Sequence, residues 1–319
     1  MRIMNSMPRL TTVGTYQAWR ADSSRCLAAA LEIARSHGLS HQSPHLFPTG
    51  TNLVVALDAW LVLKIYPPLL RRQFASERAT LLQLRGRLVI SIPEIVLEGE
   101  RDEWPYLVLT RLPGVIGAQA WPKLPEDAKE RVLRQIGETI AEIQRAPVGK
   151  LSCIEPGWSE FISRQIEGCR ARHERLGLAQ KYLDGLDDIL RDAATLIPMD
   201  GPSVILTGEY IPENFLLSCE NDNWQLTGLI DFGDVMTGWS EYDLLGPSAF
   251  MTAGVPRRVE SLFRGFGYSR ADVNFALKRR LMALLLLHRF SDPNRHICIE
   301  GWQQKAGDLF ELQELLWPI

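Results

Sequence analysis

The stretch Leu206–Leu244 reads LTGEYIPENFLLSCENDNWQLTGLIDFGDVMTGWSEYDL, and the prediction of the fold starts from it. It holds a carboxylate at Glu209, a side-chain amide five residues later at Asn214, and a second carboxylate, Asp231, at the end of an apolar run. One carboxylate can take or orient the proton of a nucleophile, and two oxygen donors can hold Mg²⁺ against a triphosphate. The stretch therefore indicates a phosphoryl-transfer site.

Two charged residues upstream extend this pattern. Lys64 lies in the apolar run VLKIY, where an ammonium group needs an anionic partner if it is buried. Glu77 follows thirteen residues later, in the predicted helix QFASERATLLQL, and could be that partner. A lysine held by a helical glutamate and directed at the phosphates is the arrangement that kinases use. The alternative is that both charges face solvent, Lys64 on an exposed edge strand and Glu77 on the outer face of its helix.

Two weaker signals concern a nucleotide. In FPTGTN, residues 47–52, Gly50 and Thr51 form a turn in which backbone N–H groups could approach phosphate. No Walker motif and no complete G-x-G-x-x-G motif is present, so an ordinary turn is the alternative. The backbone of Thr110 and Leu112, at the end of the run LVLTRL, could bind an adenine edge, and a plain strand end is the alternative.

The N-terminal part of the chain reads as a small mixed α/β unit. A helix is expected over residues 23–36, and TNLVVAL and WLVLKIY read as a hairpin. A helix over residues 70–84 and two further strands, IPEIVLEGE and WPYLVLTRL, complete this unit.

After Pro125 the pattern becomes helical. Helices are expected over 126–145 and within 157–175 and 178–196, and Ser269–Asp272 reads as a capping box that opens a helix ending near Arg289. We therefore predict an α+β, bilobal, protein-kinase-like fold. Residues 1–111 would form a small β-rich nucleotide-binding lobe, and residues 112–319 a larger, mostly helical lobe with the catalytic loop, metal site and substrate pocket, the nucleotide lying in the cleft between them.

The composition is that of an ordinary globular protein. Of 319 residues, 46% are hydrophobic and 23% are charged, and the net charge of −3 does not indicate a nucleic-acid or anionic-membrane surface. The longest apolar run, Leu281–Leu287, is far shorter than the roughly 20 residues of a membrane span. Five scattered cysteines and an N-terminus without the apolar core of a signal peptide indicate a reducing compartment, so we expect a cytoplasmic protein.

Several motifs in one order along the chain resemble the aminoglycoside phosphotransferase family of small-molecule kinases. Within that family the chain is most similar to the hygromycin B phosphotransferases. The matching segments are GTNLVVAL, VLKIY, the glutamate of ASERATLL, EWPYLVLTRLPG, IGETIAEIQRAP, GEYIPEN and TGLIDFGDVMTGWSEYDL. The loop and the DFG segment are the specific ones.

The resemblance implies a bilobal kinase-like fold, Mg²⁺, and ATP or GTP as the phosphate donor. It also implies roles for single residues. Glu209 falls where the family has its catalytic aspartate, and Asn214 and Asp231 match the Mg²⁺ ligands. Lys64 and Glu77 match the phosphate-binding pair, and the backbone at Thr110 and Leu112 matches the segment that faces adenine.

This chain departs from the family pattern in two places. The His-Gly-Asp of the family reads Thr207-Gly208-Glu209, and its helix-ending Leu-His reads Ile143-Gln144. A glutamate reaches roughly 1.5 Å further than an aspartate, and a misplacement of about 1 Å can cost about 100-fold in rate. The active site is therefore either retuned or weakened.

The sequence thus predicts a Mg²⁺-dependent transfer of the γ-phosphate of ATP or GTP to a hydroxyl of a small, cationic molecule. An aminoglycoside such as hygromycin B is the leading acceptor, and no nucleic-acid or membrane partner is expected. Two alternatives stay open: a nucleotide- or ligand-binding pseudokinase with weak turnover, and a kinase of a different hydroxylated metabolite. Acids that a polycation could use include Glu160, Glu167, Asp272, Asp292 and Glu300.

Overall fold

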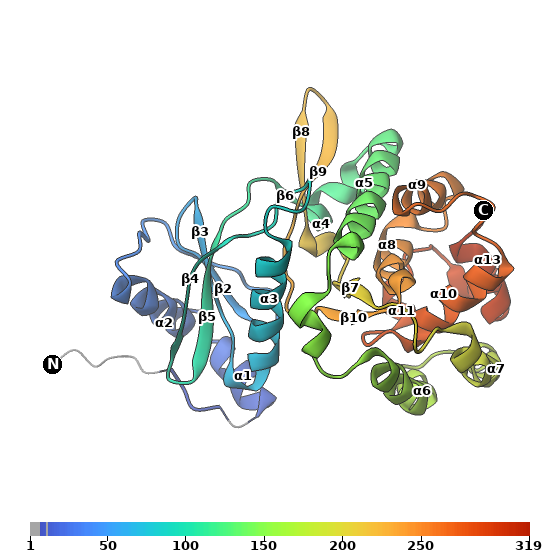
Figure 1. Cartoon of the computed structure of the whole chain (residues 1–319), viewed down its shortest axis with the longest axis horizontal. Coiled ribbons are helices and arrows are strands. Elements are labelled where there is room, and N and C mark those ends of the chain that lie inside the picture. The colour runs from blue at the N-terminus through green and yellow to red at the C-terminus, as the bar shows by residue number, and fades with distance from the viewer. Residues whose placement is uncertain (1–6, 11) are drawn as a thin grey trace. The chain divides into compact units, whose positions relative to one another are not determined.

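A computed structural model describes residues 7–10 and 12–319 of the chain, and these form two compact units (Figure 1). The first unit contains the described residues up to Arg85 together with Ser91–Pro113 and Asp231–Asp234. The second contains Gly86–Ile90, Gly114–Ile230 and Val235–Ile319. The four residues 231–234 therefore belong to the first unit, although the chain on both sides of them belongs to the second.

The first unit is built on a five-stranded antiparallel sheet with the order β1-β2-β3-β5-β4. Its strands are β1 (His45–Leu46), β2 (Leu53–Ala56), β3 (Leu61–Ile65), β4 (Ile95–Arg101) and β5 (Trp104–Thr110). Its helices are α1 (Val13–Arg20), α2 (Ser23–Ser36), the short η1 (Pro68–Leu70) and α3 (Arg71–Leu84).

Helices cover both faces of this sheet (Figure 1). In β3, successive side chains alternate between the faces. Leu63 and Ile65 are buried in one core with Cys26 and Ile33 of α2, whereas Lys64 between them points to the opposite face, where α3 lies. The sequence pattern of β3 therefore sets a single charge on the α3 side of an otherwise apolar strand.

The predicted elements of this unit are present. The helix over residues 23–36 is confirmed as α2, which starts where the Asp22 side chain accepts a hydrogen bond from Arg25 N. The predicted hairpin is β2 and β3, with Val54 opposite Lys64. The predicted helix over residues 70–84 begins one residue later, because Pro68 opens a separate 3-10 turn before it.

The second unit is larger and mostly helical. Its longer helices are α5 (Glu126–Arg145), α6 (Trp158–Arg175), α7 (Gln180–Leu196), α9 (Pro256–Phe266), α10 (Phe275–Leu287) and α13 (Leu309–Leu316). Short helices are α4 (Gly117–Ala120), α8 (Leu245–Pro247), α11 (Pro293–His296) and α12 (Trp302–Lys305). Single turns of other helix types are η2 (Trp121–Lys123), η3 (Gly149–Cys153), η4 (Pro212–Asn214), η5 (Ser240–Leu244) and η6 (Ser248–Thr252).

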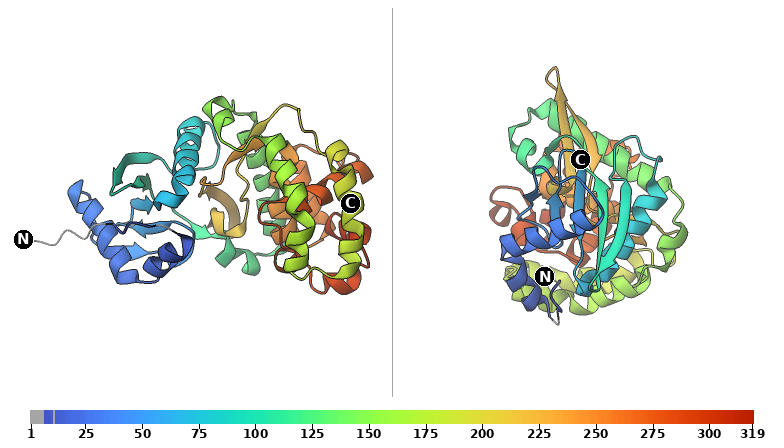
Figure 2. Two further views of the ribbon diagram at one scale, coloured as in Figure 1. Left: turned by 90° about the horizontal axis from the view of Figure 1, so that it is seen from below. Right: turned by 90° about the vertical axis from the view of Figure 1, so that its left-hand side faces the viewer.

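Two small antiparallel sheets lie in this unit. One pairs β7 (Val204–Leu206) with β10 (Met236–Gly238), and the other has the order β6 (Val115–Ile116), β8 (Phe215–Glu220), β9 (Asn223–Leu229). Strands β8 and β9 form the prominent gold hairpin of Figures 1 and 2. Its two-residue turn, Asn221 and Asp222, has positive φ at both positions, as a type I′ turn requires.

The helix predicted over residues 126–145 is confirmed as α5, whose buried face is aliphatic. This helix packs against α9 at very short range. A Cβ atom on Gly137 would clash with the carbonyl oxygen of Leu262, and one on Gly265 would clash with the carbonyl oxygen of Arg134. The two glycines therefore allow the backbones of α5 and α9 to touch.

One predicted helix start is wrong. Ser269–Asp272 does not cap a helix, because Asp272 accepts hydrogen bonds from both the backbone N and the hydroxyl of Ser269, which closes a turn. Helix α10 instead begins at Phe275, after Asn274, whose side chain accepts from Leu277 N. It ends at Leu287, close to the predicted end near Arg289.

The five cysteines are all free thiols. Among the described residues, no helix combines the length and the apolar character that crossing a membrane would need.

The packing of α5 on α9 gives a prediction about stability. Gly137→Ala and Gly265→Ala should each lower the free energy of unfolding by about 2 kcal/mol or more, because the added methyl group forces two backbones apart. The control is Gly168→Ala in α6, where a Cβ meets nothing within 4 Å. It should stabilise the chain by about 0.5–1 kcal/mol through helix propensity. Urea unfolding measures all three, and equal effects at Gly137 and Gly168 would contradict the close approach.

Candidate functional site

The centre of the first unit's site is the ammonium group of Lys64. Lys64 is 5% exposed and lies in β3 opposite Leu107 of β5. Its Nζ donates to Glu77 Oε2 at 2.6 Å and to Asp231 Oδ1 at 2.8 Å. The ion pair that the sequence predicts between Lys64 and Glu77 is therefore present, and Asp231 joins it from 167 residues further along the chain.

Burial and charge act in opposite directions on this cluster. Burial by itself lowers the pKa of Lys64, but the carboxylates of Asp231 and Glu77 outweigh it and hold that pKa above its ordinary value. Burial raises the pKa of Glu77, which is 1% exposed and also accepts a hydrogen bond from the Tyr66 hydroxyl at 2.6 Å. Lys64 thus remains a cation with two anchored oxygen partners.

Asp231 combines an ionised side chain with an unusual backbone. Burial opposes its ionisation, yet the adjacent Lys64 holds the pKa of Asp231 below its ordinary value. Its φ of +67° is left-handed, which costs a non-glycine residue about 1–2 kcal/mol. Lys64 and the N–H of Gly233 both use Oδ1, and the side chain stays 38% exposed. A charged carboxylate is therefore kept accessible on a residue with a left-handed backbone.

Glu209 and Asn214 lie in the second unit, in the loop between β7 and β8. Asn214 is 7% exposed, and its Nδ2 donates to the carbonyl oxygen of Glu209 at 3.0 Å. The backbone carbonyl oxygen of Asn214 accepts a hydrogen bond from the N–H of Ile230, the residue that precedes Asp231 in the chain. Since the amide nitrogen is used by the loop, the side-chain oxygen Oδ1 is the atom that Asn214 can offer to a cation. Glu209 is half-buried.

The start of this loop is fixed by Asp243, a residue that the sequence analysis did not single out. Asp243 is 2% exposed and accepts hydrogen bonds from the backbone N–H groups of Thr207, at 3.0 Å, and Gly208, at 2.9 Å. Burial raises the pKa of Asp243 to about 7, although these N–H groups and the Gln144 side chain favour its ionised form. No local pattern marks Asp243, because its partners are more than thirty residues away.

The residues of the first unit that were predicted to contact a nucleotide differ in their exposure and in the hydrogen bonds that they already make. Gly50 is exposed and has a φ of +95°, a backbone conformation that favours glycine. The carbonyl oxygen of Thr51 accepts from the Tyr16 hydroxyl at 2.7 Å, so α1 anchors this turn. The N–H of Thr110 is already donated to Glu94 O, and an adenine contact by Thr110 would have to use its carbonyl oxygen. Leu112 follows the end of β5.

The predicted site residues therefore fall into two groups. The first unit brings Lys64, Glu77 and Asp231 into direct contact, and the second brings Glu209 and Asn214 together in one loop. Asp231 and Asn214 each present a carboxylate or amide oxygen, which is the donor type that Mg²⁺ takes. Each unit thus carries one oxygen of a type that suits a magnesium ion.

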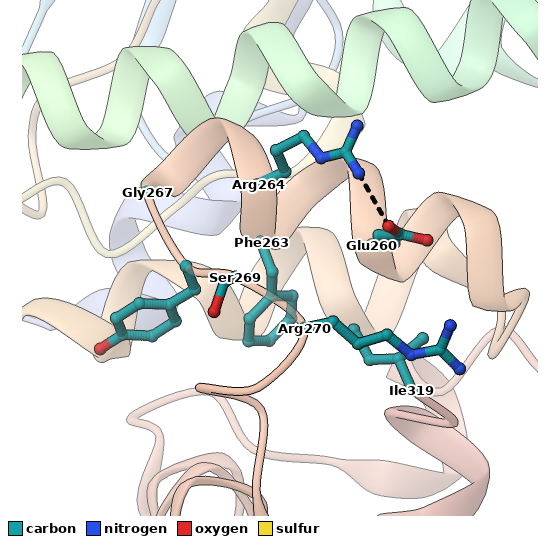
Figure 3. Close-up of a pocket in the computed structure, with 8 residues that line it drawn as sticks. Glu260, Phe263, Arg264, Gly267, Ser269, Arg270 and Ile319 are labelled. Atoms are coloured by element: carbon teal, nitrogen blue, oxygen red, sulfur yellow. Dashed lines mark hydrogen bonds and ion pairs between the residues drawn. The ribbon is translucent and has the colours of Figure 1, made fainter.

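A separate hollow of about 350 Å³ opens beside the C-terminal end of α9 (Figure 3). It is lined by Glu260, Phe263, Arg264, Gly267, Tyr268, Ser269, Arg270 and Ile319. None of the predicted site residues lines it, and its only charged contact drawn in Figure 3 joins Arg264 to Glu260.

The buried ion cluster predicts a non-additive stability change. Lys64→Met should lower the free energy of unfolding by about 3 kcal/mol or more, because it leaves Glu77 buried without a cation. Adding Glu77→Gln should restore part of this loss, since the neutral amide can still accept from Tyr66. Lys123→Met, at an exposed lysine, is the control and should change little. The idea fails if the double variant unfolds at the same urea concentration as Lys64→Met.

Asp243 predicts a pH dependence of stability. Its pKa of about 7 lies above the ordinary 3.8. At a pH between these two values, Asp243 keeps its proton in the folded chain and has lost it in the unfolded chain. The contribution of Asp243 to stability therefore falls as the pH rises from about 4 to about 7. Asp243→Asn does not titrate, and its stability relative to the wild type should improve with rising pH, by at most about 1.4 kcal/mol per pH unit. Parallel stability curves for the two proteins would contradict this.

Comparisons with known proteins identify the family. An aminoglycoside 3′-phosphotransferase of Streptomyces ribosidificus is 29% identical over 165 residues, which are 49% of this chain and 57% of that relative. The chain thus spans little more than half the length of the curated relative it matches.

Solved structures share the fold. The GDP complex of wild-type aminoglycoside 2′-phosphotransferase-IIIa aligns with a TM-score of 0.66 at 20% identity, over 89% of this chain and 94% of that one. The apoenzyme of macrolide 2′-phosphotransferase MphH from Brachybacterium faecium aligns with a TM-score of 0.58 at 18% identity, over 82% and 90%. The predicted fold class, a β-rich unit followed by a larger helical one as in these kinases, is confirmed. A model of the phosphotransferase enzyme family matches residues 50–281, well over half of the sequence, and the chain belongs to that family.

Proposed function

We propose that the protein transfers the γ-phosphate of ATP or GTP to a hydroxyl group of a small cationic molecule, with an aminoglycoside such as hygromycin B as the leading acceptor. The observation that carries the proposal is the buried cluster of Lys64, Glu77 and Asp231. Burying an ammonium group between two carboxylates costs free energy, so a stable fold keeps such a cluster where it has a function. A lysine next to a carboxylate that can bind a metal suits the binding of metal-complexed phosphates.

In this proposal residues 1–111 bind the nucleotide. Lys64, oriented by Glu77, would contact the phosphates, with the turn at Gly50 and Thr51 beside them and the backbone of Thr110 and Leu112 at the adenine. Asn214 and Asp231 would hold Mg²⁺, which when bound neutralises charge on the phosphate oxygens. The GDP complex of the structurally similar 2′-phosphotransferase supports a nucleotide donor.

Residues 112–319 would carry the catalytic loop and bind the acceptor. The acceptor hydroxyl oxygen attacks the γ-phosphorus as the bond to the β,γ-bridging oxygen breaks, and the nucleoside diphosphate leaves. Glu209 orients the hydroxyl and accepts its proton late, because the transition state is loose and geometry matters more than base strength. Asp243 keeps the loop that carries Glu209 in place by its bonds to Thr207 and Gly208.

A cationic acceptor is supported by the names of the relatives and by exposed acids of this unit. Glu167 and Glu300 are exposed, whereas Glu160 pairs with Arg164 and Asp272 closes its own turn with Ser269. Transfer would place a doubly negative phosphate group on the aminoglycoside where its RNA target presents its own phosphates. Repulsion between them would weaken binding, and this would make the host resistant to the antibiotic. We place the protein in the cytoplasm, where nucleoside triphosphates are available, with no nucleic-acid or membrane partner.

Two alternatives are favoured by single observations. Thr207-Gly208-Glu209 stands where the family has His-Gly-Asp, which favours a pseudokinase that binds nucleotide with weak turnover. The likeness to a macrolide 2′-phosphotransferase favours a kinase of another hydroxylated compound.

The test measures ADP or GDP release and phosphate transfer with hygromycin B, kanamycin and a macrolide. Wild type should phosphorylate an aminoglycoside, and Glu209→Gln should lower kcat by about 100-fold or more with unchanged nucleotide affinity. Glu209→Asp should lower kcat by about tenfold, because the loop is set for the longer side chain.

Each other outcome selects an alternative. Near-zero rates in all three proteins would identify a binding module. A faster Glu209→Asp variant would show that the wild-type loop is weakened rather than retuned. Turnover of the macrolide alone would overturn the aminoglycoside assignment.

A further inference from the structure

Helix α3 presents a second polar side chain one turn before Glu77. Gln73 and Glu77 are four residues apart and therefore lie on the same face of the helix. The Gln73 amide accepts from Asn52 Nδ2 at 3.0 Å and donates from its Nε2 to Asp234 Oδ2 at 3.0 Å. All of these residues belong to the first unit.

The direction of both hydrogen bonds follows from the chemistry of the partners. An ionised carboxylate only accepts, so the nitrogen of Gln73 must face Asp234. The oxygen of Gln73 then faces Asn52, which must donate its amide N–H. Only a side chain that both donates and accepts can make this bridge with these partners.

The bridge joins two segments that the proposed function uses. Asn52, which is 4% exposed, follows Gly50 and Thr51 in the turn assigned to the phosphates. Asp234 ends the segment that starts with the metal ligand Asp231.

Helix α3 therefore holds the segment 231–234 at both ends. Glu77 reaches Asp231 through Lys64, and Gln73 contacts Asp234 directly. Between them Gly233 lies against Gln73, where a Cβ would come within 3.3 Å of the Gln73 Cβ. These four residues are in neither a helix nor a strand, and the side chains of Lys64 and Gln73 join them to the first unit.

We propose that Gln73 is a positioning residue that fixes the turn 50–52 and the segment 231–234 to α3, so that the phosphate-binding turn and the metal ligand keep one relative geometry. This inference rests on the proposed function for its catalytic meaning, but the bridge itself is a property of the folded chain. Gln73 touches neither substrate nor metal in this scheme and acts through Asn52 and Asp234.

The first experiment needs no nucleotide. Gln73→Glu sets a carboxylate against Asp234, and amide hydrogen exchange in peptides that cover 50–52 and 231–234 should become at least about threefold faster. In Gln73→Glu with Asp234→Asn, the new amide at 234 can donate to the new carboxylate at 73, and Asn52 can still donate to it. Exchange should return to within about twofold of wild type. The control is Gln83→Met, at the other glutamine of α3, which should leave both peptides unchanged.

Two results of this experiment overturn the proposal. One is unchanged exchange in Gln73→Glu. The other is a double variant whose amide hydrogens exchange as fast as those of Gln73→Glu alone. Exchanging the donor and the acceptor would restore a specific hydrogen bond but would not repair a general structural disturbance.

The second experiment measures the affinities for MgADP and MgGDP, and for ADP and GDP in EDTA, by calorimetry. Gln73→Glu should weaken Mg-nucleotide binding about tenfold and metal-free binding less, and the double variant should recover. If wild type binds no nucleotide, the proposed function fails while the exchange result still decides the bridge. If wild type binds and Gln73→Glu binds equally well, the positioning role alone fails.

Discussion

The organisation of the first unit depends on one buried ammonium group. Lys64 stands alone as a charge in an apolar strand, and its burial is tolerable only because two carboxylates meet it. Glu77 comes from the helix on the same face of the sheet, but Asp231 must be delivered from a distant part of the chain. The requirement to satisfy Lys64 therefore explains why a four-residue segment, flanked by the second unit, belongs to the first.

The second unit also buries an ionisable group that needs hydrogen-bond partners, here the acid Asp243 instead of a lysine. Its loop between β7 and β8 leaves two N–H groups pointing inward, and the buried carboxylate of Asp243 accepts from both. Asn214 closes the same loop from its other end by donating to the Glu209 carbonyl oxygen. The loop Thr207-Gly208-Glu209 is thus fixed by hydrogen bonds at both ends.

Local patterns predicted the elements well and the long-range contacts poorly. Helices α2 and α5 follow from their apolar spacing, and the Lys64–Glu77 pair follows from a charge in an apolar strand. The predicted start of α10 was wrong because Ser269 and Asp272 hydrogen-bond to one another in a turn whose sequence resembles a capping box. Asp243 and Gln73 were missed because their importance lies in partners far away in the sequence, which no periodicity reveals. The functional roles assigned to all predicted site residues stay predictions: Glu209, Asn214, Asp231, Lys64, Glu77, Gly50, Thr51, Thr110 and Leu112.

The contact between α5 and α9 has a consequence for how such a protein could be altered. At Gly137 and Gly265 the nearest atoms across the contact belong to the main chain, so no neighbouring side chain can shift to make room for a larger residue. Substitutions that the fold tolerates should therefore accumulate at exposed positions of this unit and not at these two glycines. The surface of the helical unit can then vary in sequence while the contact between α5 and α9 stays the same.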